Sequence, residues 1–329
     1  MNNIEENILC VSAGLSSKKS PLLETLKNNH NAKIIPGKLF KENSLDKLLR
    51  KIPILRQFSK YYLNIKYLNK KIKEIAKEYD YLFIVKGNFV RKETLKKILK
   101  NRKHPIIIGW SPDDIFLTHN NSEILKDAAP FYDFFFTAKK VNIEKQQLKK
   151  MGFKNPFFIQ QGYSANIHYP NPKKDSFFKE KIIFIGYGEK FRFQYLNFLA
   201  KKGLEIHVWG NGWGKFIRKD KNLKIHNKPL IGILYSEAIS NAFISLCFLR
   251  KINNDQHTSR TFEIPACKGF MIAERSSEHL SFYEEDKEAV YFSNKNELLS
   301  KIIFFKQNKS IRDKIAEAGY KRTINSGYS

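Results

Sequence analysis

Cysteine is scarce in this chain, and its three residues follow no metal-binding pattern. Cys10, Cys247 and Cys267 stand far apart, and each lies in an apolar run. This spacing argues against the paired thiols of a zinc site and against the dense cysteine framework of a small secreted domain. We therefore expect three reduced cysteines in the cores of a cytoplasmic protein.

Long apolar runs and a basic leader are also missing. No stretch approaches the roughly 20 apolar residues that a helix needs to span a bilayer. The first residues include Glu5 and Glu6, where a secretory signal would carry basic residues. Both absences favour a cytoplasmic chain without a membrane span.

Acidic residues are few, with 32 Asp and Glu against 59 Lys and Arg and a formal net charge of +27. Such an excess is typical of proteins that bind nucleic acid, an anionic membrane or acidic substrates, and a compositional bias toward lysine gives the same charge. The sequence has no zinc-finger spacing, no aromatic RNA-binding motif and no basic tail. A nucleic-acid partner is therefore disfavoured.

The segment from Lys47 to Lys77 is both basic and amphipathic. Its apolar residues recur every three or four positions, with Lys and Arg in the gaps, which predicts a helix in which Pro53 starts or kinks the chain. The pattern fits a helix that packs on a core with a solvated face. It also fits a helix that docks on anionic lipid, with the protein peripheral on the inner face of the membrane.

Short apolar segments alternate with polar, helix-patterned segments along the whole chain. A length of 329 residues suits two domains, and the alternation predicts parallel sheets covered by helices. The expected strands are 7–12, 32–36, 81–86, 105–110, 134–137, 156–160, 181–186, 205–210, 223–226, 242–248, 270–273 and 289–292. The expected helices are 21–28, 45–78, 92–100, 121–128, 141–151, 191–202, 231–240, 260–268, 297–307 and 311–325.

Residues 164–181 interrupt this rhythm with prolines, charges and little apolar periodicity. They predict a linker between an N-terminal domain, 1–163, and a C-terminal domain, 182–329. Two successive α/β halves imply two Rossmann-like domains whose parallel sheets face each other across a cleft. Ligands of such sheets bind beyond the carboxyl ends of the strands.

The stretch from Thr258 to Ala273 combines several groups that suit a sugar nucleotide. Thr258, Ser259 and Arg260 stand at the start of a short predicted helix, and Glu263 follows one turn later. Hydroxyls, helix N–H groups and an arginine can hold phosphate oxygens. A carboxylate can accept hydrogen bonds from the vicinal hydroxyls of a sugar. The other interpretation is an ordinary helix, turn and strand of an α/β domain.

This stretch resembles the donor-site signature of the spore maturation protein (CgeB-like) glycosyltransferases, which have the two-Rossmann-domain GT-B fold. The family's pattern is Arg-x-Phe-Glu, then Pro-Ala-Cys-x-Gly and a short apolar strand. Lys268 stands where the family often has glycine. The matching residues are Arg260, Phe262, Glu263, Pro265, Ala266, Cys267 and Gly269. The resemblance covers most of the chain and is densest over 181–326.

The resemblance implies transfer of a sugar from a nucleotide sugar to a hydroxyl acceptor, without a metal. Arg260 would stabilise the departing diphosphate, and Glu263 would hold the donor ribose. Asp255 precedes Glu263 by the spacing at which related transferases place a first acidic residue, on the sugar hydroxyls. Thr258 and Ser259 are expected at the donor phosphates. His257 is a further donor-side candidate.

The glycine turn after strand 181–186 is a second donor-side feature. Gly186 matches a Phe-x-Gly turn of the family, and glycine lets a backbone approach a ligand closely. Arg192 lies a few residues later and is expected to meet the donor diphosphate. A solvated helix arginine is the alternative for Arg192.

Acceptor-side candidates follow the strands of the N-terminal domain. Asp113 and Asp114 come after strand 105–110 and match an Asp-Asp pair of the family. They would accept the proton of the acceptor hydroxyl or bind the acceptor, and a helix cap is the alternative. The pair is not an Asp-x-Asp, so no metal is expected. Gly14, Ser16 and Lys86 also follow strands and are expected to line the acceptor side.

The sequence therefore predicts an α/β, GT-B-like glycosyltransferase of glycan biosynthesis, at the cell surface or elsewhere. It needs no cofactor beyond its nucleotide-sugar co-substrate, and its acceptor is a glycan, a lipid-linked molecule or a protein. Two alternatives remain, a nucleotide-sugar epimerase on the same fold and a non-enzymatic, basic nucleic-acid-binding protein.

Overall fold

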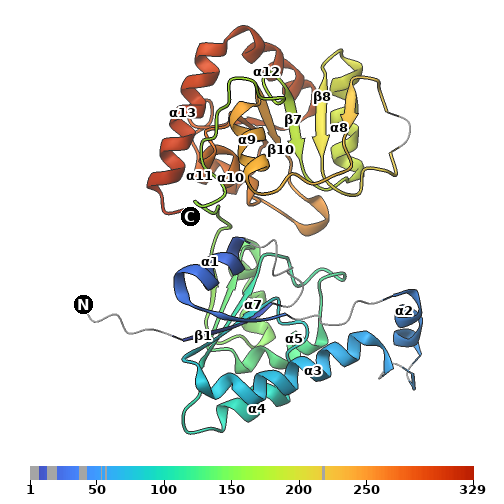
Figure 1. The fold of residues 1–329 in the computed structure, drawn as a ribbon, viewed down its shortest axis with the longest axis vertical. Coiled ribbons are helices and arrows are strands. Elements are labelled where there is room, and N and C mark those ends of the chain that lie inside the picture. Colours follow the sequence, from blue (N-terminus) through green and yellow to red (C-terminus); the bar gives the residue numbers. More distant parts are fainter. Residues whose placement is uncertain (1–6, 13–20, 37–42, 53, 56–57, 217–218) are drawn as a thin grey trace. The chain divides into compact units, whose positions relative to one another are not determined.

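The computed structural model describes residues 7–12, 21–36, 43–52, 54–55, 58–216 and 219–329. The chain forms two compact units, Met1–Gln160 and Gln161–Ser329. Each unit is built around one parallel sheet of six strands (Figure 1).

The first unit has a sheet whose strand order is β2-β1-β3-β4-β5-β6, with every neighbouring pair parallel. The strands form where short apolar runs can be buried between layers of helices, which is typical of parallel sheets. Their bounds are β1 (Ile8–Ser12), β2 (Lys33–Pro36), β3 (Tyr81–Val85), β4 (Ile106–Ser111), β5 (Phe134–Thr137) and β6 (Pro156–Phe158).

The helices of the first unit cover both faces of this sheet. On one face, Leu9 and Leu82 pack with Ile65 and Leu68 of α3. On the other face, Leu23 of α1 packs with neighbouring strand residues. The helices are α1 (Pro21–His30), α2 (Ser44–Lys51), α3 (Lys60–Ile75), α4 (Lys92–Leu99), α5 (Glu123–Ala128), α6 (Lys140–Glu144) and α7 (Gln147–Met151), with 3₁₀ turns η2 (Ala76–Glu78) and η3 (Ala129–Phe131).

The second unit repeats the architecture with the strand order β12-β11-β10-β7-β8-β9, again all parallel. Every residue of its central strands β7 and β10 is buried, as expected for a sheet covered on both faces. The strands are β7 (Ile182–Ile185), β8 (Ile206–Trp209), β9 (Leu223–Ile225), β10 (Ile244–Cys247), β11 (Met271–Glu274) and β12 (Val290–Phe292).

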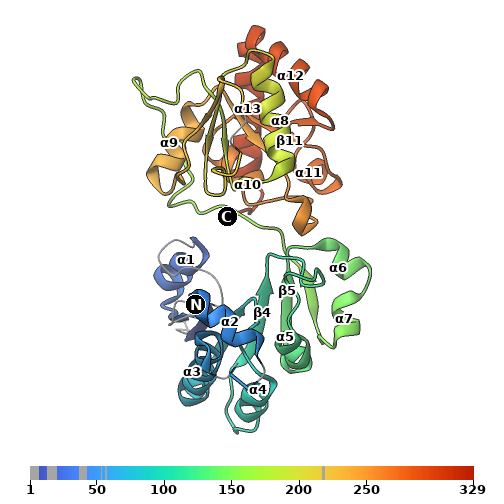
Figure 2. The ribbon, with the colours of Figure 1, turned by 90° about the vertical axis from the view of Figure 1, so that its right-hand side faces the viewer.

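Helices also cover both faces of the second sheet (Figure 2). Leu196 of α8 and Ile302 of α12 belong to the core of one face, and Tyr235 of α9 and Phe262 of α10 to the core of the other. The helices are α8 (Lys190–Lys201), α9 (Ile233–Asn241), α10 (Arg260–Ala266), α11 (Ser277–Phe282), α12 (Lys295–Gln307) and α13 (Lys309–Asn325), with the 3₁₀ turn η4 (Lys251–Asn253).

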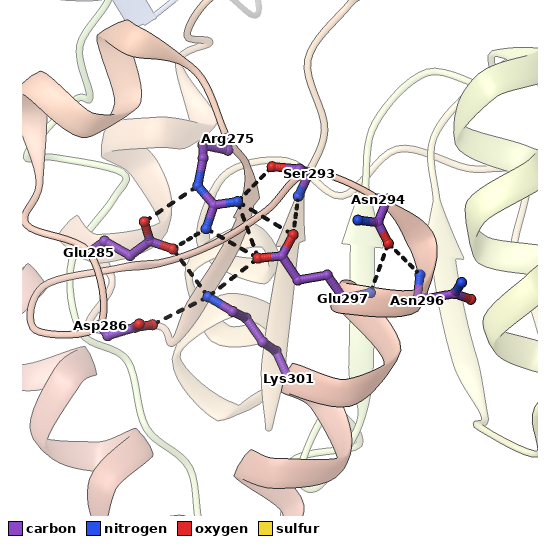
Figure 3. A network of polar contacts seen from close by, with 8 residues as sticks. All are labelled: Arg275, Glu285, Asp286, Ser293, Asn294, Asn296, Glu297 and Lys301. Atoms are coloured by element: carbon purple, nitrogen blue, oxygen red, sulfur yellow. Dashed lines mark hydrogen bonds and ion pairs between the residues drawn. The ribbon is translucent and has the colours of Figure 1, made fainter.

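A network of charged side chains stabilises the β12 edge of the second sheet (Figure 3). Arg275, which follows β11, contacts the carboxylates of Glu285 and Glu297. Lys301 of α12 lies 3.1 Å from Glu285 and 3.8 Å from Glu297. Asn294 caps α12 by accepting the backbone N–H of Glu297 at 3.0 Å. The network thereby joins the end of β11 to the first turn of α12.

The structure has a strand at each predicted strand position, and most predicted helices are present. The long helix predicted over 45–78 is instead two helices, α2 and α3. Ile52, the C-cap of α2, has extended backbone angles, as is usual before proline; Pro53 itself lies outside the described residues. The predicted helix 141–151 is interrupted at Gln146, which has φ +54°. Helix α11 carries no pattern that was recognised in the sequence.

The predicted linker, 164–181, packs within the second unit, and the two units divide earlier, between Gln160 and Gln161. The backbone N–H of Asn171 donates to Ser240 Oγ at 2.9 Å. The N–H of Lys173 donates to Asn241 Oδ1 at 2.8 Å. Polar contacts with α9 therefore attach this segment, which explains why its sequence has so little apolar periodicity.

The three cysteines are buried free thiols, as the sequence predicts. Burial raises the pKa of Cys10 to about 12 and that of Cys247 to about 11, which keeps these thiols protonated and unreactive. Over the described ranges, none of the helices combines the length and the apolar character needed to cross a membrane.

Candidate active site

The predicted donor motif lies at the carboxyl end of the second sheet. Ser259 precedes α10, and its carbonyl accepts the N–H of Glu263 at 2.9 Å. Arg260 reaches across to β7, where its Nε donates to the carbonyl of Ile185. This contact places the half-buried guanidinium of Arg260 beside the turn at Gly186. The structure thus brings together two features that the sequence analysis assigned to the donor side.

The turn after β7 packs backbone to backbone against the turn after β8. Gly186 donates its N–H to the Trp209 carbonyl at 2.8 Å and accepts the indole N–H of Trp213 at 2.8 Å. Gly210 has φ +137°, and a Cβ there would lie 2.0 Å from the Gly186 carbonyl oxygen. Only glycine fits at position 210, so the two turns form one close-packed edge beside Arg260.

Glu263 is oriented by two residues from other elements. The phenolic Oη of Tyr235, on α9, donates to Glu263 Oε2 at 2.8 Å. His168 Nε2 lies 3.9 Å from Glu263 Oε1. The rings of His168 and Tyr235 pack edge to face with centroids 5.3 Å apart. These contacts hold the carboxylate, whose side chain is only 13% exposed, in one place.

The protonation states of these two neighbours follow from their surroundings. His168 Nδ1 accepts the N–H of Ser164 at 2.9 Å, so the proton of the neutral ring is on Nε2, toward Glu263. Burial lowers the pKa of His168, and the Glu263 carboxylate offsets part of that effect. Burial and the same carboxylate raise the pKa of Tyr235 well above its ordinary value, which keeps its hydroxyl a donor.

His168 and Tyr235 are the residues that sequence reasoning missed. His168 lies in the segment interpreted as a linker, and Tyr235 lies in a largely apolar helix. Neither stands in a motif. Their contact with Glu263 depends on the pairing of segments far apart in the chain, so no local signal could have found them.

Arg192 was expected at the donor diphosphate, but its side chain is buried. Its guanidinium donates to the carbonyls of Tyr187 at 3.0 Å and Phe248 at 3.2 Å. It also lies over the ring of Phe184, and burial lowers its pKa to about 10. The arginine is therefore used to hold the loops after β7 and β10, because neither loop satisfies these carbonyls itself.

His257 and Asp255 also face the interior. His257 is fully buried; its Nδ1 contacts Glu278, and its Nε2 accepts the N–H of Gln161 at 3.0 Å. Asp255 Oδ1 accepts from the Asn253 amide at 2.7 Å. Both were expected to contact donor, and here both support the loop that leads to α10.

Thr258 belongs to a buried hydrogen-bond chain that braces the start of α10. Its N–H donates to Thr261 Oγ1 at 3.1 Å, and Thr261 Oγ1 lies 2.8 Å from His279 Nε2. The other ring nitrogen, Nδ1, lies 2.7 Å from the carbonyl of Glu274 and donates to it. Of the predicted donor residues, Ser259, Arg260 and Glu263 are the ones left partly exposed beside the Gly186 turn.

In the first unit the structure pairs Lys86 with Asp113. Lys86 Nζ lies 2.5 Å from Asp113 Oδ2, and Lys86 has the unusual φ of +64°. Asp114 is buried, and its Oδ1 accepts the N–H of Phe116 at 3.1 Å and the amide of Asn142 at 3.3 Å. These bonds favour the structural, capping role for Asp114 over the role of a catalytic base. Gly14 and Ser16 lie outside the described residues.

A hollow of about 380 Å³ lies elsewhere in the second unit. Its lining includes Ala242 and Phe243, which precede β10, and Glu180, which precedes β7. It is therefore at the amino ends of the strands, away from Arg260 and Glu263. Across the described ranges, no group of three or more His, Cys, Asp or Glu side chains is arranged to hold a metal ion.

Comparison with known proteins finds a family similarity in the second unit. Residues 192–329 match the family model described as glycosyl transferase-like. This part of the chain is therefore similar to glycosyltransferase domains. It contains α10 and all the partly exposed donor-side side chains described above, although it begins after Gly186.

The chain also resembles CgeB-like proteins, as its sequence motif predicts. It is 21% identical over 245 residues to the spore protein CgeB of Bacillus subtilis (strain 168), a match that covers 69% of this chain and 72% of that protein.

Solved structures confirm the fold. Alr3699/HepE of Anabaena, determined in complex with UDP-glucose, matches with a TM-score of 0.65 at 12% identity, over 96% of this chain and 94% of that one. Sucrose-phosphate synthase of Thermosynechococcus elongatus matches with a TM-score of 0.63 at 10% identity, over 97% and 94%. At such identities the likeness concerns fold alone, and it confirms the predicted two-sheet, GT-B-like α/β architecture.

Proposed function

We propose that this protein transfers a sugar from a nucleotide-sugar donor to a hydroxyl acceptor in glycan synthesis. The observation that carries the proposal is the pair Arg260 and Glu263, one helical turn apart on α10, with one tied to the end of β7 and the other held by Tyr235. The similarity to glycosyltransferase domains supports it. So does the UDP-glucose bound to the similar Anabaena protein.

In the proposed donor site, each partly exposed group has one task. The Glu263 carboxylate accepts hydrogen bonds from the ribose hydroxyls. The Arg260 guanidinium, assisted by the Ser259 hydroxyl, binds the diphosphate. Negative charge grows on the diphosphate as the sugar leaves, and a cation already in position stabilises that charge more than it stabilises the ground state.

On the acceptor side, we assign Asp113 the contact with the acceptor hydroxyl. Its Oδ2 is paired with Lys86, and 19% of its side chain is exposed. Asp114 would hold the loop after β4 in place, through its hydrogen bonds with Phe116 and Asn142.

Donor screening followed by product analysis tests this function. The purified protein is first incubated with nucleoside diphosphates and their sugars, and the shift of its unfolding temperature identifies the base. The cognate donor is then supplied with and without candidate acceptors. A transferase forms a glycosylated acceptor and releases the nucleoside diphosphate.

The alternatives give different products. An epimerase changes the sugar of the donor when no acceptor is present and releases no nucleoside diphosphate. A nucleic-acid-binding protein responds to no nucleotide sugar and is instead stabilised by DNA or RNA in a salt-dependent manner. Either result would overturn the proposed function.

A further inference from the structure

Helix α2 of the first unit exposes its apolar residues and buries its acid. Leu45 and Leu48 are 61% and 56% exposed, whereas Asp46 is 5% exposed. A surface helix normally shows the reverse arrangement, with an apolar stripe toward the core. The orientation of α2 therefore needs a local cause.

The cause is that Asp46 is a hydrogen-bond acceptor for two helix starts. It forms a capping box with Asn43, with bonds of 2.8 and 2.9 Å. Its Oδ1 also accepts the N–H of Lys60, the first residue of α3, at 3.1 Å, and Lys60 Nζ lies 3.6 Å from Oδ2. Asp46 thus turns toward α3, and the two leucines are left facing solvent.

The apolar exposure continues beyond the helix, toward the start of α3. Ile54 is 81% and Phe58 62% exposed. In contrast, the adjoining α3 buries its own apolar stripe in the core. We call the exposed set the α2 patch, and its members are Leu45, Leu48, Ile52, Ile54, Leu55 and Phe58. Exposed apolar side chains gathered in one short segment of the chain mark an interaction site.

The charges around the patch identify what covers it. Lys47 and Lys51 of α2 are exposed, as is Lys66 of α3. Asp46 is the single acid between residues 43 and 60, and it is buried and paired. A second copy of the chain would bring like charges together, which is unfavourable at an interface. Exposed apolar side chains among unopposed cations suit the surface of an anionic bilayer.

We propose that the α2 patch docks the first unit on an anionic lipid surface, with its apolar side chains in the headgroup region and its lysines at lipid phosphates. The inference does not depend on Arg260, Glu263 or the transfer reaction. If both proposals hold, docking through the first unit would bring a lipid-linked acceptor to the protein.

Vesicle sedimentation of the full chain tests the proposal. We expect binding to phosphatidylcholine vesicles that contain phosphatidylglycerol, and little binding to phosphatidylcholine alone. Binding should weaken as salt is raised, because the screening length falls from about 10 Å at 0.1 M to about 3 Å at 1 M. Lys47→Gln/Lys51→Gln should weaken binding to the anionic vesicles by roughly 30-fold, since each cation near such a surface strengthens binding about fivefold.

The apolar part needs a matched pair of variants. Leu48→Ser/Ile54→Ser should reduce vesicle binding at least tenfold. The control is Ile303→Ser/Phe304→Ser, which removes two exposed apolar side chains from α12 and should bind as the unaltered protein does. Circular dichroism and the unfolding temperature show that each variant is folded.

Four results would overturn the proposal. They are absence of vesicle binding, equal binding to both lipid compositions, equal loss in the α12 control, and unchanged vesicle binding of the Leu48→Ser/Ile54→Ser variant. If that variant instead abolishes a concentration-dependent dimer of the parent protein, the patch is an interface between copies.

Discussion

Tyr235 Oη and Glu263 Oε2 are joined by a 2.8 Å hydrogen bond that links α9 to α10. Tyr235 is buried, and the carboxylate of Glu263 is nearly buried. His168 Nε2 lies 3.9 Å from the other carboxylate oxygen, Oε1. In such a dry setting one hydrogen bond sets the orientation of an acidic side chain. The proposed ribose contact of Glu263 therefore depends on a buried residue from another helix.

Tyr235→Phe keeps the ring and removes this hydrogen bond. Because a hydrogen bond to a charged group contributes about 1.5–3 kcal/mol, we expect the donor dissociation constant to rise by roughly 10- to 100-fold. Glu263→Gln should lose at least as much affinity. Titration calorimetry with the cognate nucleoside diphosphate measures both effects.

Tyr291→Phe is the control for this pair. Tyr291 is also buried and donates to the carbonyl of His279 at 2.8 Å, so the substitution costs a similar hydrogen bond away from Glu263. Its donor affinity should be unchanged. Equal affinities for Tyr235→Phe and the parent protein would remove the positioning role from Tyr235.

Substitutions of Arg260 and Arg192 should affect different properties. The first should lower the reaction rate, and the second should lower the stability of the fold. Arg260→Ala is expected to lower kcat by about 10²–10³, the cost typical of losing one group that stabilises developing charge, with a small change in unfolding temperature. Arg192→Ala should lower the free energy of unfolding by on the order of 2–4 kcal/mol, because it leaves the Tyr187 and Phe248 carbonyls without their donor. Kinetics and urea unfolding of both variants check this contrast. A large loss of stability in Arg260→Ala with a large loss of kcat only in Arg192→Ala would contradict it.

The buried His279 makes the second unit sensitive to acid. Burial lowers its pKa from 6.5 to about 4. Between these values the unfolded chain binds a proton that the folded chain excludes, so stability is complete above about pH 6.5 and falls as the pH drops toward 4. The full effect is on the order of 3 kcal/mol. We expect the urea midpoint of the parent protein to fall across this range.

His279→Gln should flatten that pH dependence, even if the variant is less stable throughout. His104→Gln is the control, because His104 is exposed in the first unit. An unchanged slope in His279→Gln would assign the acid sensitivity to another group.

Transfer should proceed without a divalent metal. In the proposed mechanism the departing diphosphate is neutralised by Arg260, and the sequence has no Asp-x-Asp at the donor side. We therefore expect the initial rate to be the same in saturating EDTA as in added Mn²⁺. Loss of activity in EDTA that Mn²⁺ restores would contradict this prediction.

The fold was predictable because its signals are local. The strands of the second sheet are short and mainly apolar, and a glycine that the sequence itself displays follows β7. Periodicity does not say which face of a helix meets the core, however. The pattern of 45–78 therefore gave no indication that Asp46 would be buried and Leu48 exposed, since that depends on the contact of Asp46 with Lys60.

The candidate site was predictable only in its motif residues. Arg260 lies where the motif led us to expect, at the end of the sheet beside the Gly186 turn, and Glu263 follows it on the same helix. Arg192 and His257 have the right chemistry for phosphate or sugar, but burial directs them to backbone groups. Burial is a property of the assembled unit, so residue type and spacing could not reveal it.

The parallel sheet of the second unit has a consequence for its synthesis on the ribosome. β7 pairs with β8 on one side and with β10 on the other, and β10 emerges only after β8, β9 and α9. Until then β7, which is apolar throughout, is an unpaired sheet edge of the kind that recruits other chains. Pairing of such distant segments is also slow. We expect nascent chains that stop after β9 to aggregate unless a chaperone covers that edge.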